Sequence, residues 1–125
     1  MAQSTAEMLQ NALKSFESST PDIEATAVIS SDGLVMASRL PADVEEERIG
    51  AMSAALLSLG DRTVSELDKG EIQQVIVKGS GGYTVLMKVG QDADAVLGCM
   101  TNEKVKLGLL FLEMKRAADT IGQYI

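Results

Sequence analysis

Histidine is absent from this sequence of 125 residues, and so is tryptophan. Without histidine the chain lacks the side chain that most often serves as a general base or a metal ligand. Cys99 is the single cysteine, so the chain can form no internal disulfide and contains no Cys-x-x-Cys zinc or redox motif. These absences exclude most familiar enzyme chemistries, and we expect a non-catalytic protein that needs no cofactor.

Basic and aromatic residues are also scarce. Lysine and arginine total 11 against 18 acidic residues, which gives a net charge of -7, and aromatic residues make up 3% of the chain. The acidic surplus lies within residues 1–67 and is densest at Asp43 and Glu45–Glu47. Such a surface repels nucleic-acid phosphates, and few aromatic rings are available to stack on bases. We therefore expect no nucleic-acid partner.

No long hydrophobic run is present. The longest apolar stretch, residues 105–112, is interrupted by Lys106 and Gly108 and falls far short of the roughly 20 residues that a membrane span needs. Residues 1–5 have neither the basic nor the apolar region of a secretory signal. With a single cysteine, this predicts a cytoplasmic protein that does not insert into membranes.

Hydrophobic periodicity and turn residues predict one domain over residues 1–125. Ser4 with Glu7, and Asp43 with Glu46, have the spacing of capping boxes, and Thr101 or Asn102 can cap the last helix. The expected helices cover residues 5–18 and 43–67 and a segment ending near 124, and the expected strands cover 25–30, 34–38, 71–78, 83–89 and 95–100. The short connections favour antiparallel pairing. We expect an α+β fold in the order α-β-β-α-β-β-β-α, with one five-stranded, mainly antiparallel sheet and helices on both faces.

The helix over 43–67 has an unusual distribution of side-chain sizes. One stripe is apolar and includes Ile49, Met52, Leu56, Leu59, Thr63 and Leu67. Other faces carry small residues, among them Gly50, Ala51, Ala54, Ala55 and Ser58. Small side chains allow another backbone to approach closely, but they fit a well-buried helix equally well, so composition alone leaves both interpretations open.

Three short motifs favour structural roles. Gly79–Gly82 is not followed by Lys-Ser or Lys-Thr and opens a strand, so it indicates a hairpin loop and not a phosphate-binding loop. Asp92 and Asp94, in the turn expected over 90–94, lack the later glycine and glutamate of a calcium loop. Cys99 lies inside an apolar run and is expected to be an inert core residue. We expect no bound metal.

Arg48 and Arg62 lie on the helix over 43–67. An arginine supplied to another protein can stabilise phosphoryl transfer in a GTPase. The alternative is a solvated residue paired with a nearby acid, as Arg62 would be with Glu66 one helical turn away. The alternative is favoured for both arginines.

Three segments, in this order and spacing, resemble the Roadblock family, which includes the Roadblock-type dynein light chains. Ala25–Ala37 looks like the first hairpin of the family, which turns through Asp-Gly. Gly82–Met87 is similar to the strand after its Gly-rich loop. Ala95–Met100 followed by Leu107–Ala118, with the small Gly108 near the helix start, looks like the last strand and helix. The resemblance covers nearly the whole chain and implies a Roadblock domain with profilin-like layering.

The resemblance implies a homodimer or heterodimer in which the third strands of two subunits pair across a two-fold axis. The two second helices then form a platform for Ras-like small GTPases. Bacterial members of the Mgl type stimulate GTP hydrolysis by reshaping the active site of their partner. The predicted strand over 71–78 fits this arrangement, since it contains few charges that would guard a sheet edge. This chain has almost no tails beyond the domain, which favours a minimal platform.

Two sets of residues follow as candidates. The expected partner-binding residues are Glu45, Glu46, Glu47, Arg48, Ala51, Ala55, Ser58 and Arg62. The expected dimer interface consists of Glu71, Gln73, Val75, Ile76, Val77, Ala54 and Leu57. The function indicated is a dimeric, cytoplasmic signalling module that binds or regulates a Ras-like GTPase, including stimulation of its GTP hydrolysis. The alternative is a scaffold, a structural adaptor that assembles a larger complex without regulating a GTPase.

Overall fold

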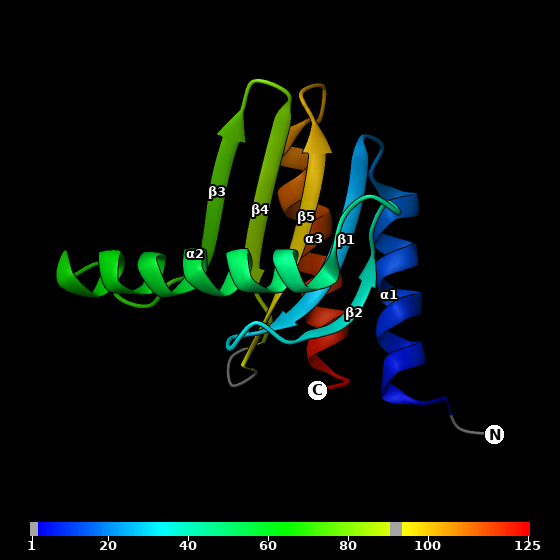
Figure 1. Ribbon diagram of the computed structural model, residues 1–125, viewed down its shortest axis with the longest axis horizontal. Helices are drawn as coiled ribbons and strands as arrows, with labels where there is room; N and C mark the ends of the chain where they lie inside the picture. The colour runs from blue at the N-terminus through cyan, green and yellow to red at the C-terminus, as the bar shows by residue number, and fades with distance from the viewer. Residues whose placement is uncertain (1–2, 91–93) are drawn as a thin grey trace.

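The computed structural model describes residues 3–90 and 94–125, and these ranges contain three helices and five strands (Figure 1). The helices are α1 (Thr5–Ser19), α2 (Glu46–Glu66) and α3 (Leu107–Gly122), and the strands are β1 (Ile23–Ser30), β2 (Val35–Arg39), β3 (Gln74–Gly79), β4 (Gly82–Lys88) and β5 (Ala95–Asn102). The predicted order of elements is therefore confirmed. Most of the turn expected over 90–94, including Asp92, lies outside the described residues.

The five strands form one sheet in the order β2-β1-β5-β4-β3, and every neighbouring pair is antiparallel. Helices α1 and α3 pack on one face, whereas α2 crosses the other face (Figure 1). This arrangement confirms the predicted α+β class with helices on both faces. It also leaves β2 and β3 as the two edge strands.

The larger core lies between the sheet and the pair α1 and α3. Strand residues such as Val28 and Leu97 alternate toward it and meet Leu13 of α1 and Met114 of α3, all of them buried. At the start of α1 the Ser4 hydroxyl accepts a hydrogen bond from the Glu7 amide at 3.1 Å, which confirms the N-cap half of the predicted capping box.

The second core, under α2, is much smaller. Ala27, Ile29, Leu86 and Val96 form it, and the partly buried Ile49, Leu56 and Leu57 of α2 pack against it. The rest of the predicted apolar stripe is not covered, because α2 leaves a groove open beside Met52 and its last turns continue past β3 beyond the sheet edge (Figure 1). The exposed fractions of Met52, Leu59 and Leu67 are 49%, 63% and 64%.

The capping box predicted at Asp43 and Glu46 is wrong. Helix α2 begins at Glu46, and its N-cap residue, Glu45, makes no side-chain capping bond. The preceding segment forms a turn in which the Val44 amide binds the Pro41 carbonyl at 3.0 Å. The Glu46 carboxylate instead accepts a hydrogen bond from the Ser38 hydroxyl of β2. A contact between elements thus replaces the local cap.

The cap predicted at Thr101 or Asn102 is also wrong, because β5 continues to Asn102 and α3 starts only at Leu107. Asn102 is held in the strand by two bonds to Asp22, one from its backbone amide at 3.1 Å and one from its side-chain amide at 2.9 Å. Its side-chain oxygen accepts from the Lys104 amide at 2.8 Å, which turns the chain toward α3.

Strand β3 is shorter than predicted and begins at Gln74, so Glu71 and Gln73 precede it. The cause is Ile72, which is buried beneath α2. A Cβ atom added to Gly60 would lie 2.5 Å from Ile72 Cδ1, so the missing side chain of Gly60 provides the space that Ile72 fills. Beyond Gly60, α2 extends past β3, the last strand on that side of the described sheet (Figure 1).

None of the helices in the described ranges is both long enough and apolar enough to cross a membrane.

Candidate functional site

The edge of β3 is the first feature of the candidate site. It is the outermost strand on its side of the sheet, and its sequence Gln-Val-Ile-Val-Lys-Gly contains one charged residue. Ile76 and Val77 are each 44% exposed, which is high for β-branched strand residues. Lys78 lies over the ring of Tyr83 at 5.7 Å from its centroid. An edge of this kind favours pairing with another strand.

The opposite edge, β2, is protected by α1. The side-chain amide of Gln10 donates to the Ser38 carbonyl at 2.8 Å. Arg39 Nε lies 2.8 Å from Glu17 Oε2, and the other oxygen of Glu17 accepts from the Thr26 hydroxyl at 3.0 Å. The two edges therefore differ, and β3 is the one open to a new strand.

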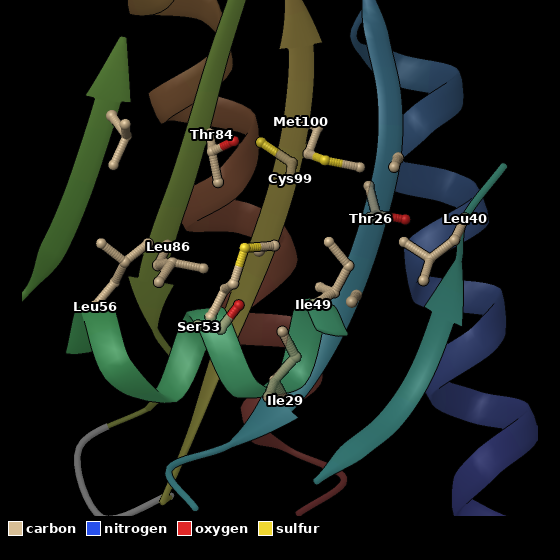
Figure 2. Close-up of a pocket in the computed structure, with 15 residues that line it drawn as sticks. Thr26, Ile29, Leu40, Ile49, Ser53, Leu56, Thr84, Leu86, Cys99 and Met100 are labelled. Atoms are coloured by element: carbon tan, nitrogen blue, oxygen red, sulfur yellow. The ribbon is translucent and has the colours of Figure 1, made fainter. Parts of the chain in front are cut away.

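An apolar groove lies beside α2 on the same face of the sheet (Figure 2). It has a volume of about 240 Å³. Its lining comes from β1, β3, β4, β5, α2 and Leu40, and includes Thr26, Leu40, Ile49, Met52, Ser53, Leu56, Val77, Thr84, Leu86 and Met100. The groove exists because α2 covers only part of this face of the sheet (Figure 1).

Sequence reasoning did not predict the groove. Met100 and Thr84 belong to strands that were expected, but their spacing does not tell which part of a sheet face a helix will cover. Met52 belongs to the predicted apolar stripe of α2, and in the structure it is 49% exposed where it lines the groove.

The predicted partner-binding residues of α2 lie together on its outer surface. Arg48, Ala51, Ala55, Ser58 and Arg62 recur every three or four positions along the helix and are all exposed. The exposed Glu45, Glu46 and Glu47 stand at the start of the same helix. This surface is acidic at one end and lined by small side chains along its length.

The arginines of this surface have ordinary surroundings. Arg62 Nη2 lies 3.3 Å from Glu66 Oε1, and both side chains are well exposed. A surface pair of this kind contributes about 0–1 kcal/mol. The predicted pairing of Arg62 with Glu66 is therefore confirmed.

The predicted dimer residues fall into separate places. Val75 and Val77 face α2, because Val75 packs against the second core and Val77 lines the groove. Ile76 alternates to the face that carries α3. Ala54 and Leu57 lie on the side of α2 away from the groove. Ala54 approaches the β1–β2 turn, and Leu57 packs against the second core.

Cys99 is buried in the larger core, where its thiol lies 3.8 Å from the sulfur of Met114. Burial raises its pKa from 9.0 to about 12, although a hydrogen bond with the Val85 backbone opposes the shift. A thiol in this state is a packing residue and not a nucleophile. In the described part of the chain, no three side chains of the types that bind metals form a group.

Comparison with known protein families matches residues 6–101 to the Roadblock/LC7 domain. "Uncharacterized protein MJ0310" of Methanocaldococcus jannaschii is 39% identical over 102 residues, which cover 82% of this chain and 87% of that protein.

Solved structures share the fold. A Roadblock/LC7 domain from Streptomyces avermitilis has a TM-score of 0.85 at 19% identity, covering 92% of this chain and 95% of that one. The gliding protein MglB of Thermus thermophilus has a TM-score of 0.84 at 16% identity, covering 99% and 93%. Acanthamoeba castellanii profilin IB, with a TM-score of 0.66 at 18% identity over 94% and 99%, shows that the layering is profilin-like, as predicted. The match over residues 6–101 and the close relative together establish that the chain belongs to the Roadblock/LC7 domain family.

Proposed function

We propose that this chain is a homodimeric binding module whose α2 surface is a platform for a Ras-like small GTPase and regulates it. One observation carries the proposal. Helix α2 extends past the open edge of β3, while an apolar groove lies on the same face of the sheet. A two-fold axis at β3 would bring the protruding end of α2 from one subunit close to the groove of the other.

The dimer would bury what a single subunit exposes. With two β3 strands side by side, the end of α2 from one subunit extends over the sheet of the other. The exposed Leu59 lies on α2 at the level of β3 and Leu67 just after the end of the helix, so both would come close to the partner subunit. Burial of this apolar surface stabilises the dimer by about 25 cal/mol per Å² removed from water. The side of α2 that borders the groove carries Met52 and Leu56, so we place the helix contacts of the dimer there.

The outer surfaces of the two α2 helices would then form one broad face. Ala51, Ala55 and Ser58 make it flat, and Glu45–Glu47 place negative charge at each end. A flat surface of small side chains lets a partner backbone approach closely, and the acidic ends attract a basic surface on that partner. The class of partner, a Ras-like GTPase, comes from membership of the Roadblock family.

In this proposal the chain is not an enzyme and holds no cofactor. It contains no histidine, and its arginines on α2 are solvated, so regulation acts on the active site of the GTPase itself. In this proposal the protein acts in the cytoplasm, together with its GTPase partner.

The test is capture of partners from a lysate of the source cells, followed by measurements on purified proteins. We expect the immobilised chain to retain a small GTPase more strongly with a slowly hydrolysed GTP analogue than with GDP. The purified GTPase should bind the wild-type chain and the Ala6→Arg variant equally, because Ala6 is an exposed alanine of α1 on the other side of the sheet. Ala55→Arg should abolish binding. Capture of a partner that is indifferent to the nucleotide would favour the adaptor function instead.

A further inference from the structure

We infer the register of the dimer: the two β3 strands pair antiparallel with Ile76 of each subunit opposite the partner's Ile76. This inference rests on the dimer of the proposed function and adds which residues meet. It follows from the direction of the backbone hydrogen-bonding groups along β3 and from the two-fold symmetry.

The hydrogen bonds between β3 and β4 decide which residues of β3 face outward. The Lys88 amide donates to the Gln73 carbonyl at 3.0 Å, so these two residues form a hydrogen-bonded pair. In an antiparallel ladder such pairs alternate with pairs that are not hydrogen-bonded. Val75 and Val77, two and four residues further along, therefore bond to β4 at Leu86 and Thr84.

The remaining residues of the strand point their backbone groups the other way. Gln74, Ile76 and Lys78 lie opposite Met87, Val85 and Tyr83 in pairs that are not hydrogen-bonded. Their amides and carbonyls are consequently directed at the open edge. A strand from a second copy has to match its own outward residues to these three.

Two-fold symmetry restricts the match further. In a symmetric antiparallel pair the two-fold axis runs between one residue and the same residue of the partner strand. Residues whose backbone groups point to the open edge must also lie opposite such residues of the partner. Centres at Val75, Ile76 and Val77 all satisfy this rule. A centre at Ile76 pairs Gln74 with the partner's Lys78, Ile76 with the partner's Ile76, and Lys78 with the partner's Gln74, so every outward residue is used.

With either of the other two centres, one outward-facing residue of β3 lies opposite a residue outside the partner's strand. A centre at Val75 places Lys78 opposite the partner's Ile72, which is buried beneath Gly60 and lies outside the strand. A centre at Val77 places Gln74 opposite the partner's Ser80, which lies in the tight turn between β3 and β4. Because each unused backbone group loses a hydrogen bond, the register centred on Ile76 is favoured.

The side chains agree with this register. On the α2 face, Val75 lies opposite the partner's Val77, which pairs two β-branched residues at a position that is not hydrogen-bonded, where side chains are closest. On the other face, Lys78 meets the partner's Gln74, a neutral side chain. A centre at Lys78 would instead oppose two like charges, which destabilises a sheet.

Disulfide trapping distinguishes the registers. In the proposed one, the Cα atoms of residue 75 and the partner's residue 77 are about 4.5 Å apart. The two copies of residue 75 are then separated by about 8 Å, as are the two copies of residue 77, which is too far for a disulfide. Within one strand, residues 75 and 77 cannot bond either, because their Cβ atoms stand about 7 Å apart.

The experiment uses the full chain with Val75→Cys, Val77→Cys and both changes together, under mild oxidation at a concentration where the wild type sediments as a dimer. The double variant should form covalent dimers at least about tenfold faster than either single variant. The wild type is the control for Cys99, whose buried thiol should not react. Sedimentation under reducing conditions tests whether each variant remains a dimer.

Each other outcome is decisive. Rapid linkage of Val75→Cys alone, or of Val77→Cys alone, would place the axis at that residue and overturn the register. Dimers without linkage in any variant would overturn pairing through β3 while the dimer itself stands. A wild-type monomer at high concentration would instead overturn the dimer of the proposed function, so the two failures are distinguishable.

Discussion

The carbonyl oxygen of Gly33, in the β1–β2 turn, occupies the place where a Cβ atom of Gly50 would have to be. Gly33 itself has a φ of 92°, which favours glycine, and Gly50 is buried in the first turns of α2. This contact between two backbones sets how closely α2 approaches the sheet. It therefore positions both the outer surface of α2 and the part of the helix that extends past β3.

Replacement of Gly50 by alanine should destabilise the fold. Alanine is the better helix former by about 1 kcal/mol, but its Cβ overlaps the Gly33 carbonyl, and such overpacking costs about 1–3 kcal/mol. The matched control is Gly108→Ala in α3, where a Cβ meets no atom within 4 Å. The control should be stabilised by about 0.5–1 kcal/mol. Denaturant unfolding measures both, and a shift of the same sign in the two variants would contradict the close contact.

A lysine at the open edge should weaken the dimer. Ile76→Lys places a charge at a contact that symmetry repeats, so its desolvation counts twice, and the dissociation constant should rise by about 100-fold. Val75→Lys should act in the same direction. Leu34→Lys is the control, because Leu34 is 68% exposed beside β2, the protected edge. Sedimentation velocity over a dilution series gives the constants, and equal effects of Ile76→Lys and Leu34→Lys would rule out the β3 edge.

The sequence was sufficient to predict features that depend on local spacing. The order of elements follows from periodicity and turn residues, and the N-cap at Ser4 follows from its spacing to Glu7. The same spacing failed at Asp43 and Glu46, because Ser38 of a neighbouring strand binds the Glu46 carboxylate. A local rule cannot foresee a competitor that is distant in the sequence.

The uncovered end of α2 depends on the length of the helix relative to the width of the sheet, which residue spacing does not reveal. The apolar stripe of α2 is continuous through Leu59 and Leu67, and such a stripe ordinarily faces a core. Here the described sheet ends at β3, and Ile72 turns the chain under Gly60, so the last part of the stripe extends beyond the sheet. The position of the partner-binding candidates on the outer surface could be predicted, since they share one side of a regular helix.

Alkaline pH should destabilise the fold through Cys99. Its pKa is raised from 9.0 to about 12 in the folded chain, so the folded state keeps the proton that the unfolded state loses above pH 9. Stability is therefore fully present below pH 9 and falls as the pH rises from 9 toward 12. Between pH 8 and pH 10 the wild type should lose about 1.4 kcal/mol more than Cys99→Ala, which lacks the thiol. Unfolding curves at both pH values measure the difference, and equal losses would show that the thiol ionises in the folded state.

The last prediction separates the acidic end of α2 from its small-residue surface. Glu46→Lys combined with Glu47→Lys should slow association with the GTPase, most clearly at low salt. Charges at the edge of an interface mainly change the rate at which the two proteins meet, and salt screens them. Glu47→Lys alone should have the same direction of effect, and it leaves the bond between Glu46 and Ser38 intact. Glu103→Lys is the control for charge, since Glu103 is exposed in the turn before α3.

Ala55→Arg should act differently, because it adds a long side chain to the flat part of the surface. It should accelerate dissociation or prevent docking, with little dependence on salt. Kinetic binding measurements at two salt concentrations, with sedimentation of each variant alongside, separate these effects from loss of the dimer. If all of these variants remain folded and dimeric and bind the partner with wild-type kinetics, the recognition surface is not on α2. The adaptor function, through another face of the dimer, would then be the better account.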